Sequence, residues 1–426
     1  MDPSSVLPVE LLSKIFGHYL TDREIDVQSF DFSDGLWVLG KVSSAWRSTA
    51  NSSQSLWSTI TITRAFPTND FGRDTPPLRG SSLVSRKNAS EIRKAILTEI
   101  LRRSRSYPLT ISMSFPLSMQ HGELIPPSDY QPLFAIIAVH SHRWQAMELK
   151  GYHHPYLLDD FVHTPSFRIQ SLRKLHAMLR DKAVLGQVAR LCPDLLELIT
   201  GASEGEYTLA RIEMPALERL EVSGDTHALD CISAPNLKSL KIKSDPFFDI
   251  RSDHIGLPVL EFLRHSHCLV RSMDINWHGT HDDLIAILSH MSSLESLECH
   301  VPFTRAFLAE LKSPSALIPS LHTLTLWFHD IIRFPHVNFI LGMVESRLAG
   351  GILKSVRIFP VGRTSIKMFD EQLAAINAPP DVTVWLEDNS GSPTDLLDPP
   401  FAGEDYDGDI YMRQVYSGLV TEDDLP

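Results

Sequence analysis

The amino-acid sequence predicts an α/β protein: a small N-terminal helical module, then a curved solenoid of parallel strands with helices on the convex side, then a disordered acidic tail. Three observations support this. Two apolar helical patterns fill most of the first 62 residues, a leucine-rich phrase recurs along the middle of the chain, and acidic residues dominate its end. The expected boundaries are 1–62 for the module, 63–88 for a linker, 89–386 for the solenoid and 387–426 for the tail.

The first helical pattern begins at Pro8, which suits the first turn of a helix because no partner for its missing N–H is needed there. The apolar residues that follow are spaced as one helical stripe: Leu12, Ile15, Phe16 and Tyr19. A second helix is predicted over residues 36–50 and is nearly apolar all round. A module of this size cannot cover both sides of that helix, so a partner or the following domain must do so.

Three short motifs follow one another in this region. They are Leu-Pro-x-Glu-Leu-Leu-x-x-Ile-Phe from Leu7, Val-x-x-x-Trp-Arg from Val42, and Leu-Trp-Ser from Leu56. Together they resemble an F-box motif of the fungal, basidiomycete type, over roughly residues 5–62. The resemblance implies a three-helix module that binds a Skp-type adaptor protein and so joins a cullin ubiquitin ligase. It also implies the residues that contact the adaptor or form the module core: Leu7, Pro8, Leu11, Ile15, Val42 and Trp46.

Two features depart from the F-box pattern. Ser43 stands where the family often has cysteine, and residues 21–35 form a longer insertion than the compact motif has. The insertion could alter the adaptor-binding surface. The alternative interpretation of residues 1–62 is an ordinary pair of apolar helices at the start of a larger domain.

Beyond residue 63 the sequence predicts alternating helices and strands. A stretch rich in Pro, Gly and polar residues precedes a helical run over 89–105 and an alternating strand pattern over 107–115. Further helices are expected over 282–290, 304–312 and 337–348.

The phrase Pro-x-Leu-x-x-Leu recurs along the middle of the chain and usually has a further apolar residue two positions on. Clear copies begin at Pro215, Pro235, Pro258 and Pro319, and looser copies begin at Pro193, Ser293 and Leu353. They recur about every 20 to 34 residues, in or near the range of leucine-rich repeats, and each is expected to form a short strand with its leucines inward. The body therefore resembles an irregular leucine-rich-repeat solenoid, in which most copies lack the usual Asn after the strand. A general α/β domain with leucine-rich strands is the alternative.

The formal charge of −13 is concentrated at the end of the chain. After position 386, about eleven acidic residues stand against one basic residue, Arg413, which predicts disorder. The acidic balance argues against nucleic-acid binding, and no apolar run is long enough to span a membrane. No secretory segment is recognised and the four cysteines are isolated, so a reduced chain in the cytoplasm or nucleus is expected.

No catalytic residue, cofactor site or metal site is predicted. The sequence contains neither a phosphate-binding loop nor a nucleophile elbow. Two segments, 265–268 and 278–283, carry ligand-type residues without zinc spacing and are interpreted as surface or capping residues.

The favoured hypothesis is a non-catalytic substrate receptor of a Skp/cullin-type ubiquitin ligase, which binds an unknown protein target on exposed strand positions. Alternation selects the candidate target-binding residues: Glu218, Arg219, Lys238, Lys241, His322 and Thr325. The second hypothesis is an F-box-like repeat scaffold that acts outside any ligase. The third is an enzyme that uses a metal bound at 278–283.

Overall fold

The computed structural model describes residues 7–21, 35–62, 82–114, 119–120, 123–124, 130–150, 158, 161–179, 182–202, 211–224, 226–243, 256–276, 280–300, 305–312, 317–327, 334–359 and 383–386. The predicted tail and residues 63–81 of the predicted linker lie outside these residues, so both remain predictions.

Three helices form the N-terminal module. They are α1 (Val9–Thr21), α2 (Gly35–Val42) and α3 (Ser44–Ser52), and the short 3-10 helix η2 (Gln54–Trp57) follows them. The prediction of one helix over 36–50 is wrong, because Ser43 has an extended backbone and separates α2 from α3. The Ser43 side chain accepts a hydrogen bond from the backbone N–H of Trp46 at 3.2 Å. A serine inside an apolar pattern therefore caps a new helix.

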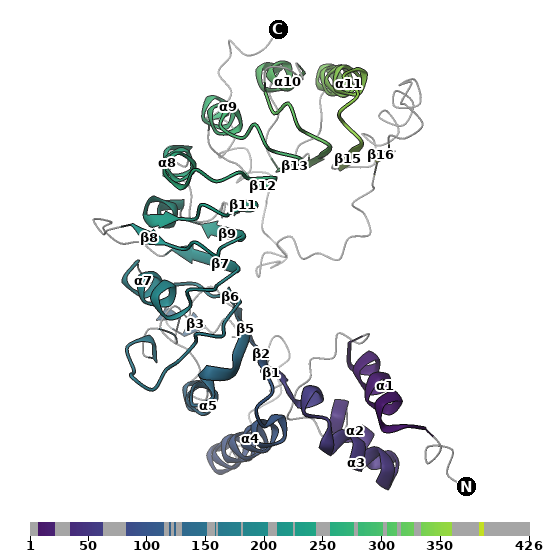
Figure 1. The fold of residues 1–426 in the computed structure, drawn as a ribbon, viewed down its shortest axis with the longest axis vertical. Coiled ribbons are helices and arrows are strands. Elements are labelled where there is room, and N and C mark those ends of the chain that lie inside the picture. Colours follow the sequence, from purple (N-terminus) through teal and green to yellow (C-terminus); the bar gives the residue numbers. More distant parts are fainter. Residues whose placement is uncertain are drawn as a thin grey trace.

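Within the described residues, twelve strands form one parallel sheet that runs the length of the molecule (Figure 1). In spatial order they are β1 (Thr59–Ile62), β2 (Leu109–Ser114), β5 (Trp144–Lys150), β6 (Lys174–His176), β7 (Glu197–Ala202), β9 (Arg219–Gly224), β11 (Ser239–Lys243), β12 (Ser272–Asn276), β13 (Ser296–His300), β14 (Thr323–Trp327), β15 (Ser355–Phe359) and β16 (Thr383–Leu386). Neighbouring strands are parallel throughout, and their spatial order follows their order in the chain. Each parallel pair needs a crossover between its strands, and this repeated connection makes a solenoid.

Helical segments fill most crossovers and lie on the outer side of the arc (Figure 1). They are α4 (Ser82–Ser104), α5 (Tyr130–Ala138), η3 (Ser141–Arg143), α7 (Lys182–Leu191), η4 (Thr226–Cys231), α8 (Gly256–Ser266), α9 (His281–Ser289), α10 (Arg305–Lys312) and α11 (Phe334–Ala349). Two small sheets accompany them, one of β3 (Met119–Gln120) and β4 (Glu123–Leu124), the other of β8 (Ile212–Glu213) and β10 (Ile232–Ser233). The predicted α/β architecture, a helical module followed by a solenoid with outer helices, is confirmed. No helix among the described residues combines the length and the apolar character that a bilayer span requires.

The Pro-x-Leu phrase is explained by a turn that precedes the strands. Its proline is the second residue of a four-residue turn closed by a backbone hydrogen bond. Leu217 N–H donates to Met214 O at 3.1 Å, and Leu237 N–H donates to Ala234 O at 3.1 Å. Proline has the φ angle that the second position of such a turn requires. The leucine that closes the turn is buried, and the strand begins two residues later.

Strand side chains alternate between the core and the inner face of the arc. In β13, Leu297 and Cys299 are fully buried, whereas Glu298 and His300 are half-buried on the opposite face. Because neighbouring strands are in register, the buried positions form continuous rows, one of which contains Leu220, Leu240, Met273, Leu297, Leu324 and Val356. Burial of each such side chain contributes about 1.5–3 kcal/mol, so these rows bind successive repeats together.

One predicted strand is a helix, and one predicted helix begins earlier than expected. Residues 258–263, predicted as a strand, lie in α8, where Val259 and Phe262 are fully buried. Pro258 is compatible with this helix because it lies in the first turn, where no intrahelical partner for its N–H is needed. The strand of that repeat is β12, which follows α8. In addition, α4 begins at Ser82, inside the segment predicted as a linker.

Candidate functional site

The outer side of α1 exposes a row of apolar side chains. Leu7, two residues before the helix begins, and Leu11 and Ile15 within it follow one another at four-residue spacing and are 42%, 46% and 47% exposed. The other side of the helix is buried through Leu12 and Phe16. Ile15 is spaced with Leu12 and Phe16 in the sequence stripe, but its side chain is exposed and lies in the outer row with Leu11. Large aliphatic side chains exposed in one row are typical of a surface that another molecule covers.

The residues of α2 and α3 divide between surface and core. Val42, at the end of α2, is 56% exposed, and Pro8 is exposed just before α1. Trp46 of α3 is half-buried, and its ring centre lies 5.0 Å from that of Phe16. Of the six residues that the F-box resemblance implies, Trp46 thus packs in the module core and the other five are exposed.

The module is continuous with the parallel sheet. β1 directly follows η2 and pairs with β2, so that Ile60 lies opposite Ile111, and both side chains are fully buried. The indole N–H of Trp57 in η2 donates to the Ala50 carbonyl of α3 at 2.7 Å. The last segment of the module is therefore also the first strand of the solenoid.

A single arginine of α4 strengthens this connection. The Arg103 guanidinium lies 4.4 Å from the ring centre of Trp57 and 5.2 Å from that of Trp37, which is within cation–π range. It also donates to Asn51 Oδ1 at 2.8 Å and to Glu99 of its own helix at 2.8 Å. Of the two possibilities that the apolar pattern left open, a partner or the following domain, the following domain thus contacts Trp37 of α2.

The inner face of the sheet pairs charges from strand to strand. Arg219 of β9 lies 2.6 Å from Glu197 of β7, and Lys241 of β11 contacts Asp274 of β12. Arg219 and Lys241, both predicted to bind a target, therefore lie on this face. Thr325 of β14 lies at the same strand position but is only 8% exposed. A mixed pattern of this kind favours a partner with its own paired charges over a polyanion.

The other three predicted target-binding residues lie just outside the strands. Glu218, Lys238 and His322 each precede a strand by one residue. Lys238 Nζ lies 2.6 Å from Glu218 Oε1, and the hydrogen bond to Lys238 lowers the pKa of Glu218. The strand repeat therefore brings Glu218 and Lys238 side by side at the rim of the inner face.

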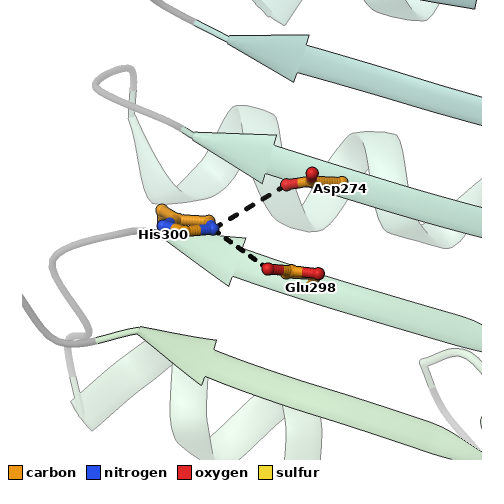
Figure 2. A group of neighbouring side chains, drawn as sticks. All are labelled: Asp274, Glu298 and His300. Atoms are coloured by element: carbon orange, nitrogen blue, oxygen red, sulfur yellow. Dashed lines mark hydrogen bonds and ion pairs between the residues drawn. The ribbon is translucent and has the colours of Figure 1, made fainter. Parts of the chain in front are cut away.

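Three side chains of β12 and β13 meet on the inner face (Figure 2). His300 Nε2 lies 3.3 Å from Glu298 Oε1 and 3.9 Å from Asp274 Oδ1. Asp274 and Glu298 are register partners on neighbouring strands, and His300 lies two residues after Glu298, so all three project from one face. One donor atom from each side chain lies within 4.8 Å of the other two.

Neighbouring side chains fix the orientation of this cluster. Lys241 contacts Asp274 Oδ2, and Trp327 Nε1 donates to Glu298 Oε1 at 2.7 Å. The His300 ring stacks on Trp327 with 4.9 Å between ring centres and 10° between planes. Burial raises the pKa of Asp274, although its contact with Lys241 acts in the opposite direction. The hydrogen bond with His300 lowers the pKa of Glu298.

The sequence prediction missed Asp274, Glu298 and His300. The first two belong to different repeats, and the strand that carries Asp274 was assigned to residues 258–263. The alternation of buried Met273 and Ile275 in β12 matches that of Leu297 and Cys299 in β13. An alignment of these two sequence patterns would have placed Asp274 beside Glu298.

The two histidine-containing segments considered as metal ligands in the sequence, 265–268 and 278–283, contain residues that bond to protein groups. His265 Nε2 is hydrogen-bonded to the Ile232 carbonyl at 2.7 Å. In the second segment, Asp283 and Thr280 cap the start of α9, with the Asp283 N–H donating to Thr280 Oγ1 at 3.2 Å. His278 lies outside the described residues.

Comparisons with known proteins identify a family for the N-terminal module and a similar solved structure for a larger part of the chain. A family model described as F-box-like matches residues 4–63, which include the three helices, η2 and β1. This match confirms the resemblance drawn from the three sequence motifs. Comparison with curated proteins finds no match. Among solved structures, a crystal structure of the Rad7 and Elc1 complex in yeast is similar over 68% of this chain and 70% of that chain, at 12% sequence identity and a TM-score of 0.32.

Proposed function

The chain carries an F-box-like domain at residues 4–63, and from this premise we propose that it is the substrate receptor of a Skp/cullin-type ubiquitin ligase. The domain would bind a Skp-type adaptor, and the inner face of the solenoid would bind a protein target. The chain itself would be a non-catalytic subunit, because its contribution is to hold the target close to the ubiquitin-conjugating enzyme.

The exposed row on α1 is the observation that carries this proposal. Leu7, Leu11 and Ile15 are each more than two-fifths exposed although the same helix buries Leu12 and Phe16 in the module core. A partner that covered the row would remove its apolar surface from water, which stabilises a complex. The firm attachment of the module through β1 and Arg103 supports the second part of the proposal, because it fixes the distance between adaptor and target.

Target binding on the inner face is supported by the shape and by the paired charges. A curved solenoid presents a wide surface suited to another macromolecule. Arg219 and Lys241 are the predicted target contacts on the strands, and Glu218, Lys238 and His322 are those at the rim. Thr325 would contribute least because it is almost fully buried.

Co-purification of the full chain with a Skp-type adaptor tests the proposal. We expect the double variant L11E/I15E to lose adaptor binding by more than tenfold, because each aliphatic side chain contributes about 1.5–3 kcal/mol when it is buried. The matched control is L257E, since Leu257 of α8 is 59% exposed and lies outside the module. R219E is a second control that changes the target surface and should leave adaptor binding unchanged.

Circular dichroism must show that each variant is folded. If the folded wild type does not bind the adaptor, the ligase assignment is wrong, and an F-box-like repeat scaffold that acts outside a ligase becomes the better description.

A further inference from the structure

We propose that Asp274, Glu298 and His300 form a binding site for a divalent transition-metal ion of the zinc type. The proposal does not depend on the function proposed above. It rests on three donor groups that the register of β12 and β13 brings together (Figure 2), on the contacts that orient them and on the charge around them.

The donor types suit such an ion. One imidazole nitrogen and two carboxylate oxygens are the mixed set that Zn²⁺ and its neighbours accept, whereas Mg²⁺ and Ca²⁺ prefer oxygen donors alone. Ligands placed around Zn²⁺ at its usual bond lengths lie about 3.3 Å apart in a tetrahedral site. The His300–Glu298 separation is already 3.3 Å, and the His300–Asp274 separation is 3.9 Å. A small side-chain rotation would bring all three donors onto one ion.

Residues outside the cluster orient its donors. Lys241 contacts Asp274 Oδ2, so the other oxygen, Oδ1, faces His300. Trp327 holds Glu298 by the indole N–H and also stacks on the His300 ring, which directs Nε2 toward the carboxylates. Contacts of this kind around metal ligands fix ring and carboxylate orientation and raise affinity.

The local charge favours an added cation. Among the ion pairs of the described residues, Lys241 is the one ammonium group that contacts this cluster, so its two carboxylates outnumber the ammonium charge. Asp274 is only 19% exposed, and burial of an incompletely compensated carboxylate is unfavourable. An ion bound to Asp274 Oδ1 would supply this compensation without displacing Lys241 from Oδ2.

Zinc binding to the full chain, stripped of metal with a chelator, tests the proposal. The wild type should bind one more equivalent of Zn²⁺ than H300Q in a titration against a chromogenic zinc indicator. E298Q should weaken binding at this site by about tenfold or more. X-ray absorption of the zinc-loaded wild type should show one imidazole and oxygen ligands.

The matched control is H176Q. His176 of β6 lies 3.2 Å from Glu148 of β5 on the same face and has no second carboxylate in the ion pairs of the described residues, so this variant should bind zinc like the wild type. If the wild type binds no zinc, or if H300Q and E298Q both retain its stoichiometry and affinity, the cluster is only an ion-pair network and the proposal is wrong. Should H300Q fail to fold, E298Q decides alone.

Discussion

Arg102 and Arg103 are consecutive residues of α4 that both bind Glu99. They differ in their other contacts. Both bind Glu99, at 2.6 and 2.8 Å, and together they lower the pKa of Glu99 to about 2, mainly through the hydrogen bond from Arg102. Because the folded-state pKa is depressed, the stability that Glu99 contributes is present above its ordinary value of 4.5 and is lost as the pH falls toward 2. Only Arg103 also reaches the N-terminal module.

Replacement of these two arginines should therefore have unequal effects. R103A should lower the free energy of unfolding by about 1–2 kcal/mol, because it removes the cation–π contact with Trp57 and the hydrogen bond to Asn51. R102A should leave stability nearly unchanged, since surface ion pairs contribute little. Urea denaturation followed by tryptophan fluorescence measures both. If R103A and R102A lowered the free energy of unfolding equally, the contact of Arg103 with the N-terminal module would contribute nothing to stability.

At the scale of secondary-structure elements, a buried arginine joins α10 to α11. Arg347 of α11 is 3% exposed, and its guanidinium donates to the carbonyls of Leu311, Leu317 and Ile318. Leu311 lies in the last turn of α10, whose carbonyls have no partner within the helix. Ile318 has φ of 53°, a left-handed conformation that is unfavourable for a β-branched residue. One side chain thus satisfies the end of a helix and a strained turn.

We expect R347A to destabilise the chain by about 3 kcal/mol or more, because it leaves buried carbonyl groups without a hydrogen-bond partner. The control is R264A in α8, where Arg264 makes an exposed ion pair with Glu261 at 2.9 Å. This substitution should change stability by less than about 0.5 kcal/mol. Thermal and urea unfolding of the two variants side by side would reveal whether burial, rather than the arginine itself, accounts for the difference.

At the scale of the whole molecule, the N-terminal module covers one end of the solenoid. β1 shields the edge of β2, and Arg103 links α4 to η2. β1 also closes the apolar core at this end, since Ile60 lies opposite Ile111 and both side chains are fully buried. The position of the module at the end of the arc (Figure 1) therefore serves stability as well as the proposed adaptor binding.

Removal of residues 1–62 should make the remaining chain self-associate, because it takes away Ile60 and so uncovers Ile111 and the apolar core at this end of the sheet. A chain that begins at residue 53 keeps η2 and β1 and should remain largely monomeric. Size-exclusion chromatography with light scattering distinguishes the two. If the chain without residues 1–62 stays monomeric and keeps the melting temperature of the full chain, the module and the solenoid are independent domains.

Much of this architecture was predictable because it depends on short sequence patterns. Alternation set the faces of strands such as β2, and the Pro-x-Leu turn marked the entry to several repeats. The predictions failed where a short apolar run fits two periods, as at residues 258–263, which form α8. They failed also at Ser43, where a local cap overrides a continuous apolar pattern.

The sequence by itself determined most of the elements and the apolar faces of their strands, since both follow from residue type and spacing within about ten positions. It also determined the F-box-like domain, through motifs that are contiguous in the chain. The tertiary structure alone decided that β1 belongs to the solenoid sheet, that Arg103 reaches Trp57, and that Asp274, Glu298 and His300 meet. The physical reason is register: the crossovers differ in length, so only the packed core fixes which residues of successive strands lie side by side.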